Sequence, residues 1–189
     1  MKKYILPSLK LTAVLLILCS VLYPLLVAAF GRFSPGKGKG TTETVNGKVV
    51  GYSLIGQKFD QDKYFWSRPS AVAFNAAGSA GSNKGPTNPD YLKDVQSKID
   101  SFLVHNPGVR KEDVPVELVT YSGSGLDPDI SPKGAYVQIA RIAKVRNIPE
   151  EKIKLLVDQH VEKSFLGVLG PEKVNVLKLN IDLDNLGTK

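Results

Sequence analysis

The sequence predicts one N-terminal transmembrane helix followed by a single α/β (α+β) domain, with a mixed sheet and flanking helices. Three observations support this prediction. The 189-residue chain has a charge-free apolar run at residues 11–30, close to its N-terminus. Runs rich in β-branched residues, which suit strands, alternate with apolar residues at helical spacing. Twice, an N-capping residue immediately precedes a proline, which is typical of a helix start. We expect a tail at 1–10, a span at 11–30, a linker at 31–45 and the domain at 46–189.

The span is predicted from Leu11–Phe30, which holds 20 residues without a charged side chain. About 20 apolar residues suffice to cross the hydrocarbon core. A cleaved signal peptide and a lipoprotein signal at Cys19 are the alternatives. The run is longer than the apolar core of about 7–15 residues in a signal peptide, and bulky Leu18 precedes Cys19. We expect a retained single-pass span with a cytoplasmic N-terminus and an extracytoplasmic domain, because long domains translocate largely regardless of charge.

Within the span, Ser20, Pro24 and Ala28 recur every four residues. This spacing offers a small-residue face for close packing against other membrane helices. Pro24 is also expected to kink the helix, because it lacks a backbone N–H.

The domain is expected to alternate strands and helices. Strands are predicted at 48–55, 114–121 and 174–183, from β-branched and aromatic runs. Helices are predicted from Pro89 to about 105, from Pro132 to about 146, and from Pro149 onward. The segment between them, 64–89, reads as mostly irregular, with Tyr64-Phe65-Trp66 as its anchor. A loop of this length inside a compact domain is usually functional or disordered.

Several kinds of chemistry are not expected. One cysteine and two histidines, without HExxH spacing, provide no predicted metal site. Residues 31–189 hold 22 Lys and Arg against 18 acids, interspersed, so no nucleic-acid stripe is predicted. Gly31–Lys37 matches GxxxxGK, but Gly38 stands where a Ser or Thr must reach magnesium. No catalytic constellation is visible, and we expect a protein that is not an enzyme by itself.

The loop SGSGLDPDISP, Ser122 to Pro132, allows two interpretations. A Gly-rich turn that opens onto a helix attracts anions through its backbone N–H groups, which would suit a nucleotide phosphate. Asp127 and Asp129 would repel phosphate, however, and no Lys or Arg lies between Ser122 and Pro132. Asp side chains in such loops commonly bond the backbone two residues on. We favour a structural or partner-facing turn.

Several sequence blocks together resemble one known family. They are SLIGQKF (53–59), YFWSRPSA (64–71), GSNKGPTNP (81–89), the long block 114–146 and VNVLKLNIDLD (174–184). In order and spacing, these blocks are similar to those of the KdpC family, the C subunit of the Kdp-type potassium-transporting P-type ATPase. The resemblance implies a single-pass protein of a bacterial or archaeal cell (inner) membrane. It implies an accessory role beside a channel-like potassium-translocating subunit and a P-type ATPase subunit.

The resemblance also bears on individual residues. One proposal for this family makes its C subunit a catalytic chaperone that raises the ATP affinity of the ATPase subunit. Under that alternative, Ser122, Gly123, Ser124 and Gly125, with Gln138 downstream, contact the nucleotide. Otherwise no cofactor is expected, and the partner subunit handles potassium. The candidates for partner contacts are Ser20, Pro24, Ala28, Arg68, Asp127 and Asp129. A third hypothesis is an unrelated anchored domain that binds a small ligand in the loop 64–89.

Overall fold

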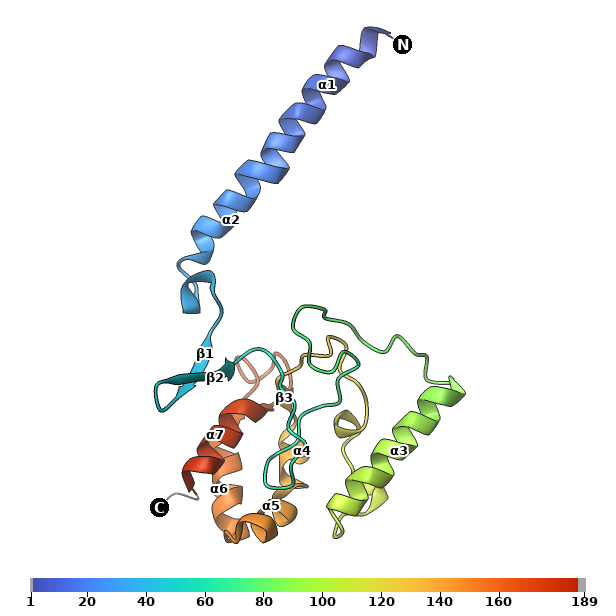
Figure 1. Cartoon of the computed structure of the whole chain (residues 1–189), viewed down its shortest axis with the longest axis vertical. Coiled ribbons are helices and arrows are strands. Elements are labelled where there is room, and N and C mark those ends of the chain that lie inside the picture. Colours follow the sequence, from blue (N-terminus) through green and yellow to red (C-terminus); the bar gives the residue numbers. More distant parts are fainter. Residues whose placement is uncertain (1, 187–189) are drawn as a thin grey trace. The chain divides into compact units, whose positions relative to one another are not determined.

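The computed structural model describes residues 2–186, and the chain divides into two compact units, Met1–Thr42 and Glu43–Lys189 (Figure 1). The first unit contains helix α1 (Lys2–Ile17), a π-helical turn (Leu18–Leu22), helix α2 (Tyr23–Gly31) and a short 3-10 turn (Pro35–Gly38). The continuous helix Lys3–Gly31 has 29 residues and a mean hydropathy of 2.6. By length and composition it is a candidate membrane span, as the sequence predicts.

The π-helical turn ends two residues before Pro24. There the N–H of Tyr23 bonds the carbonyl of Leu18, five residues back. Proline removes a helical donor, and its ring clashes with the carbonyl four residues earlier, which here belongs to Ser20. A π-bulge is one of the recognised ways in which a helix absorbs such a disruption. The irregularity expected at Pro24 therefore takes this form, within a helix that stays continuous.

The second unit combines short strands with helices, which is the α/β class predicted (Figure 1). Its elements are β1 (Thr42–Val45), β2 (Lys48–Tyr52), α3 (Pro89–His105), β3 (Asp129–Ile130), α4 (Pro132–Tyr136), α5 (Ile139–Arg146), α6 (Glu150–His160), β4 (Val161–Glu162), β5 (Lys173–Asn175) and α7 (Val176–Leu186). Two 3-10 turns lie at Lys111–Asp113 and Val116–Leu118. β1 and β2 form one sheet, and the order β3-β5-β4 makes a second, antiparallel one.

The two predicted cap-and-proline helix starts are confirmed. The Asn88 side chain accepts hydrogen bonds from the N–H groups of Asp90 and Tyr91 at the start of α3. The Ser131 hydroxyl accepts one from Gly134 N–H at the start of α4. The helix predicted over 132–146 divides in two, however, because Val137 and Gln138 separate α4 from α5.

Two of the predicted strands are wrong. Within 114–121 the structure has a 3-10 turn at Val116–Leu118 and no strand. Adjacent Leu118 and Val119 are both buried, which excludes the alternation of a strand. Of residues 174–183, only the first two belong to β5, and the rest form α7. The buried residues Val176, Leu179, Asn180 and Leu183 follow helical spacing. The Asn175 side chain accepts from the Lys178 N–H and so caps the helix.

β2 ends at Tyr52, before the predicted limit of 55, and its partner β1 begins within the segment expected to be a linker. The turn between them is Asn46-Gly47, with φ of +50° and +77°. Positive φ at both central residues defines the type I′ turn, which Asn-Gly favours. This dipeptide is the signal that indicates a hairpin here.

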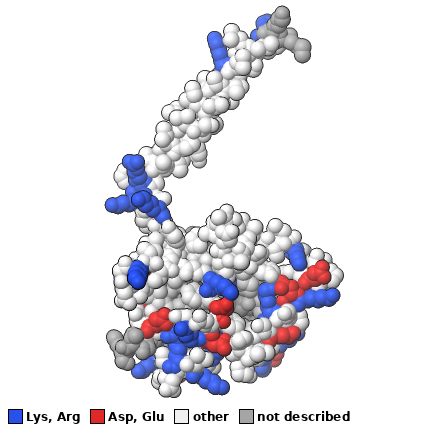
Figure 2. Space-filling model, viewed as in Figure 1, with Lys and Arg blue, Asp and Glu red and all other residues white. Residues whose placement is uncertain are grey.

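The hydrophobic core of the second unit lies between its helices and β5. Its fully or almost fully buried side chains are Phe65, Phe102, Ala135, Ile142, Ile153, Val157, Val174, Val176, Leu179 and Leu183. Phe65 is the member that comes from the irregular segment between β2 and α3. Figure 2 shows most charged side chains over the part of this unit around α3, α5 and α6, and few at the end where β1 and β2 lie.

Candidate functional site: the clamped segment 62–72 and the loop 122–132

Phe65 fixes the irregular segment to α7. Its side chain is fully buried in the core. Its backbone N–H donates to the Asn180 side-chain oxygen at 2.9 Å, and its carbonyl accepts from the Asn180 side-chain nitrogen at 2.9 Å. A buried backbone group without a partner is costly, and one amide side chain here satisfies both. The aromatic anchor predicted at 64–66 is thereby confirmed, although its polar partner was not foreseen.

Gln138 holds the next residue, Trp66. Its buried side-chain oxygen accepts from the Trp66 N–H at 2.8 Å and from the Arg141 guanidinium at 2.7 Å. Its side-chain nitrogen donates to the Gly134 carbonyl at 2.9 Å. Gln138 is 0 % exposed, and an amide side chain has two donors and one oxygen to offer. The geometry therefore commits this residue to internal contacts.

Arg141, one helical turn after Gln138 on α5, is the third side chain that holds the irregular segment. Asn180, Gln138 and Arg141 are together called the clamp. Its guanidinium donates to the carbonyls of Asp62 and Tyr64 and, through Nε, to the Asn106 side chain at 3.0 Å. The guanidinium carbon also lies 4.6 Å from the centre of the Trp66 ring. Burial lowers the pKa of Arg141 to about 10, while the Asp62 carboxylate opposes that shift. The side chain stays protonated at neutral pH.

The loop 122–132 forms hydrogen bonds with a later part of the irregular segment, at residues 69–70. The Ser122 N–H donates to the Pro69 carbonyl, and the Ser70 hydroxyl donates to the Gly125 carbonyl at 2.6 Å. Gly125 has φ of +67°, and a side-chain carbon there would lie 2.6 Å from Val72 and 2.7 Å from the Ala80 carbonyl. The backbone approaches so closely only because the residue is glycine.

Within the loop, the two acids act mainly on the protein itself. Asp127 accepts from the Asp129 N–H, the Asx turn expected from the sequence. Asp127 also pairs with Arg68 at 2.8 Å, and Asp129 pairs with Lys173 at 2.7 Å. Both carboxylates are therefore largely neutralised by neighbouring cations.

The sequence-based candidates thus fall into separate places. Gln138 and the loop 122–125 bind different parts of the strip from Trp66 to Ser70, since Gln138 bonds Trp66 and the loop bonds Pro69 and Ser70. Ser122 is buried, whereas Gly123 and Ser124 are exposed. Ser20, Pro24 and Ala28 lie in the first unit, where every side chain from 3 to 30 is exposed.

Several cavities open beside the clamp and the segment 62–72. One of about 320 Å³ is lined by charged residues, among them Arg68, Glu117 and Asp129. A second, of about 360 Å³, lies against Trp66, Phe74 and Phe102. A third, of about 230 Å³, is smaller than the roughly 300–1,000 Å³ of most ligand pockets.

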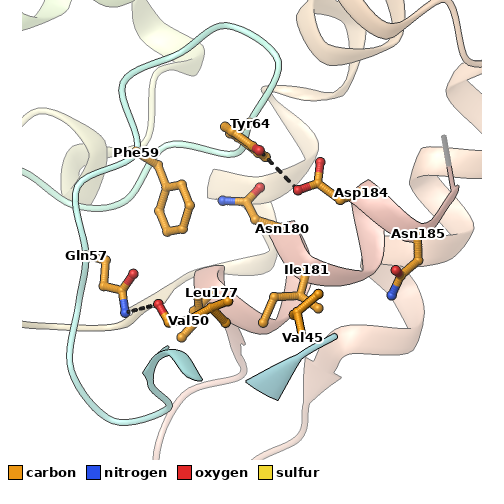
Figure 3. A pocket seen from close by; sticks show the side chains of 10 residues that line it. All are labelled: Val45, Val50, Gln57, Phe59, Tyr64, Leu177, Asn180, Ile181, Asp184 and Asn185. Carbon is orange, nitrogen blue, oxygen red and sulfur yellow. Dashed lines mark hydrogen bonds between the residues drawn. The ribbon is translucent and has the colours of Figure 1, made fainter. Parts of the chain in front are cut away.

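Figure 3 shows the third cavity, between β1, β2, α7 and the irregular segment. Leu177 and Ile181 form its apolar floor. At one side the Tyr64 hydroxyl donates to Asp184 at 3.0 Å. Burial and the neighbouring Asp184 carboxylate raise the pKa of Tyr64, so this hydroxyl remains a donor at neutral pH. Among residues 2–186, no group of three or more His, Cys, Asp and Glu side chains is placed to hold a metal ion.

Comparison with known proteins identifies the chain's family. The family model described as "K+-transporting ATPase, c chain" (KdpC) matches residues 5–185. A protein of Flavobacterium johnsoniae named "Potassium-transporting ATPase KdpC subunit" is 57 % identical over 178 residues, covering 94 % of this chain and 96 % of its own. Proteins of the same name from Bacteroides fragilis (strain YCH46) and Caldanaerobacter subterraneus are 50 % and 45 % identical, covering 97 % and 93 % of this chain and 98 % and 92 % of their own. The chain therefore belongs to the KdpC family, the c chains of K+-transporting ATPases.

Proposed function

We propose that this chain is the accessory subunit of an ATP-driven, high-affinity potassium import complex. It is needed for the assembly, stability and activity of a channel-like subunit and an ATP-hydrolysing subunit. The observation that carries the proposal is the family match over residues 5–185, which includes both the apolar helix and the folded unit. A chain that serves only as a soluble regulator would have no need of that helix.

The chain's own chemistry fits a non-catalytic part of such a complex. The buried polar side chains Gln138, Arg141 and Asn180 bind the protein's own backbone. The sequence holds no complete P-loop and no aspartyl-phosphate motif. ATP hydrolysis and ion selection are therefore assigned to the partner subunits.

The apolar helix supplies the assembly surface in this proposal. Ser20, Pro24 and Ala28 lie one turn apart and let a partner helix approach closely. Orientation follows the sequence expectation, with the N-terminus in the cytoplasm of a bacterial or archaeal cell and the folded unit outside. Arg68, Asp127 and Asp129 line the cavity that would face a partner subunit.

The test is co-purification with the two partner subunits. Ser20→Leu and Ala28→Leu place a bulky side chain on the proposed face, and Val21→Leu is the control on another face of the same turn. We expect the first two variants to lower the yield of the complex and potassium uptake together, and the control to change neither. Wild-type yield and uptake in both bulky variants would contradict the packing role.

The alternative function is that of a catalytic chaperone that contacts ATP through Ser122, Gly123, Ser124, Gly125 and Gln138. Its support is the exposure of Gly123 and Ser124 in a Gly-rich turn. Against it stand the burial of Gln138 and the internal hydrogen bond of Ser122. Titration of the full chain in micelles with a fluorescent ATP analogue separates the two functions. Binding that Gly123→Ala and Ser124→Ala abolish would favour the chaperone.

A further inference from the structure

The hairpin between β4 and β5 carries an unusual amount of exposed apolar surface. At its tip, residues 165–169, the exposed fractions are 70 % for Phe165, 78 % for Leu166, 80 % for Val168 and 58 % for Leu169. Single exposed apolar residues are ordinary on protein surfaces, but a contiguous group marks an interaction surface. None of these four side chains belongs to the core cluster of the described unit.

The tip pairs four of its five backbone N–H groups within the hairpin. Phe165 and Leu169 exchange two N–H to carbonyl hydrogen bonds, each of 2.9 Å, and the N–H groups of Gly167 and Val168 bond within the hairpin as well. A lipid environment offers no hydrogen bonds to unpaired backbone groups, so a segment that enters it must pair them internally. This hairpin meets that condition for four of its amides.

The turn itself keeps an apolar residue where a polar one would fit more easily. Leu166 and Gly167 have φ of +54° and +75°. A left-handed conformation is strained for Leu and comfortable for Asn or Gly. Leu166 is exposed and lies outside the core cluster, so packing within the folded unit does not explain an apolar residue at this position.

We propose that residues 165–169 insert into the interfacial region of the bilayer leaflet on their own side of the membrane. The tip contains no hydrogen-bonding side chain, which suits hydrocarbon better than a protein interface built around Trp, Tyr and Arg. At its base, Glu162 and Lys173 pair with each other, and Lys163 and Glu172 add one charge of each sign, a balance that suits zwitterionic headgroups. Residues 43–189 hold 19 Lys and Arg against 18 acids, so adhesion to anionic lipid by net charge is not expected.

The position of the hairpin in the folded unit favours the bilayer as the apolar surface that the tip contacts. The segment that leads from α6 to α7 lies at the same end of the unit as β1 and β2 (Figure 1). The chain arriving from the apolar helix enters the unit through β1, and this end carries few charges in Figure 2. Val49 and Leu54, which are 62 % and 70 % exposed, extend the apolar surface of the segment around β2. This role goes beyond the proposed function and does not require the potassium complex.

The experiment measures the depth of the tip in a bilayer. The full chain in a Cys19→Ser background carries Val168→Cys, labelled with an environment-sensitive fluorophore, in phosphatidylcholine nanodiscs without partner subunits. Lipids with a spin label near the headgroup or deep in the chain serve as quenchers. The matched control is Lys144→Cys on α5, an exposed position at the opposite end of the unit. We expect blue-shifted emission and quenching by the shallow label at position 168, and neither at 144.

A second variant protects this test against a misfolded hairpin. Leu166→Asn introduces a residue that tolerates the left-handed conformation and removes the apolar side chain. Losing one inserted Leu should lower the ratio of inserted to withdrawn tips by about tenfold. Adding phosphatidylglycerol or salt should leave the quenching unchanged. The proposal would be overturned if position 168 were as accessible to water as position 144. It would also be overturned if the quenching required anionic lipid. Protection that appears only when the partner subunits are added would also overturn it, in favour of a protein contact.

Discussion

Asn180 on α7 holds both backbone groups of Phe65, 115 residues earlier in the chain, through two hydrogen bonds of 2.9 Å. An asparagine amide resembles a peptide group, so it can stand in for a neighbouring strand. The long irregular segment, which has no strand of its own at this point, is thereby paired as if it lay at the edge of a sheet. The aromatic ring of Phe65 can then enter the core without leaving its backbone unpaired.

The first prediction concerns this amide. Asn180→Ala leaves the buried N–H and carbonyl of Phe65 without partners and should reduce the free energy of unfolding by about 2–5 kcal/mol. Urea unfolding of the full chain in micelles measures the effect. Asn185→Ala, on the exposed side of the same helix, is the control and should cost about 0.5 kcal/mol or less. Equal stability of the two variants would show that the Phe65 backbone finds other partners.

The second prediction is that lysine cannot replace Arg141. The guanidinium binds two carbonyls and two side-chain oxygens at fixed angles, and a lysine ammonium has no comparable fork. We expect Arg141→Lys to lower the free energy of unfolding by about 2–4 kcal/mol, although the charge is kept. Arg110→Lys, at an exposed ion pair with Asp113, should change little. A fully stable Arg141→Lys variant would mean that charge alone holds the clamp.

The third prediction separates two glycines of one loop. Gly125→Ala forces a side-chain carbon against Val72 and the Ala80 carbonyl at positive φ, so it should destabilise the chain by about 2–4 kcal/mol. Gly123→Ala meets no atom within 4 Å and should be tolerated. Thermal unfolding of both variants checks this difference. A Gly123→Ala variant that is as unstable as Gly125→Ala would contradict this prediction.

The fourth prediction concerns acid stability at α3. Burial raises the pKa of Asp94, but hydrogen bonds from Lys98 and Tyr121 outweigh it, so the net pKa lies below the ordinary value of 3.8. A lowered pKa in the folded state means stability that is present above pH 3.8 and lost as pH falls through the folded pKa. Asp94→Asn should therefore flatten the loss of stability at acid pH.

Thermal unfolding midpoints of the full chain between pH 2 and 7 measure this loss. Lys98→Met removes the main hydrogen-bond partner of Asp94. It should reduce the loss of stability at acid pH in the same way, which serves as the internal check. If the unfolding midpoint falls as steeply with falling pH in both variants as in the wild type, this pair contributes nothing to the pH dependence.

The fifth prediction concerns the side of the membrane on which the folded unit lies. In a Cys19→Ser background, Ser124→Cys and Lys144→Cys place single thiols at two exposed positions. We expect a membrane-impermeant thiol reagent to label both in intact cells, because the folded unit is proposed to be extracytoplasmic. Labelling only after lysis would reverse the proposed orientation and give cytosolic ATP access to the loop 122–132.

Local signals in the sequence were sufficient for some elements and not for others. The capping bonds of Asn88 and Ser131 involve residues two or three positions away, so the starts of α3 and α4 could be predicted. The strand predicted over 174–183 is wrong because Val, Leu and Ile suit both strands and helices. There the buried spacing of α7, set by packing against α6 and β5, decides in favour of a helix.

The apolar helix, the helix starts, the Asx turn at Asp127 and the family can all be predicted from the sequence, because each depends on residues near one another or on the order of whole blocks. The roles of Gln138, Arg141 and Asn180 emerge from the folded structure. Their bonds to residues 62–66 span 72 to 115 residues and mostly join backbone groups, which have no signature in the sequence. A buried polar side chain must find its hydrogen bonds wherever the fold brings a free donor or acceptor within reach.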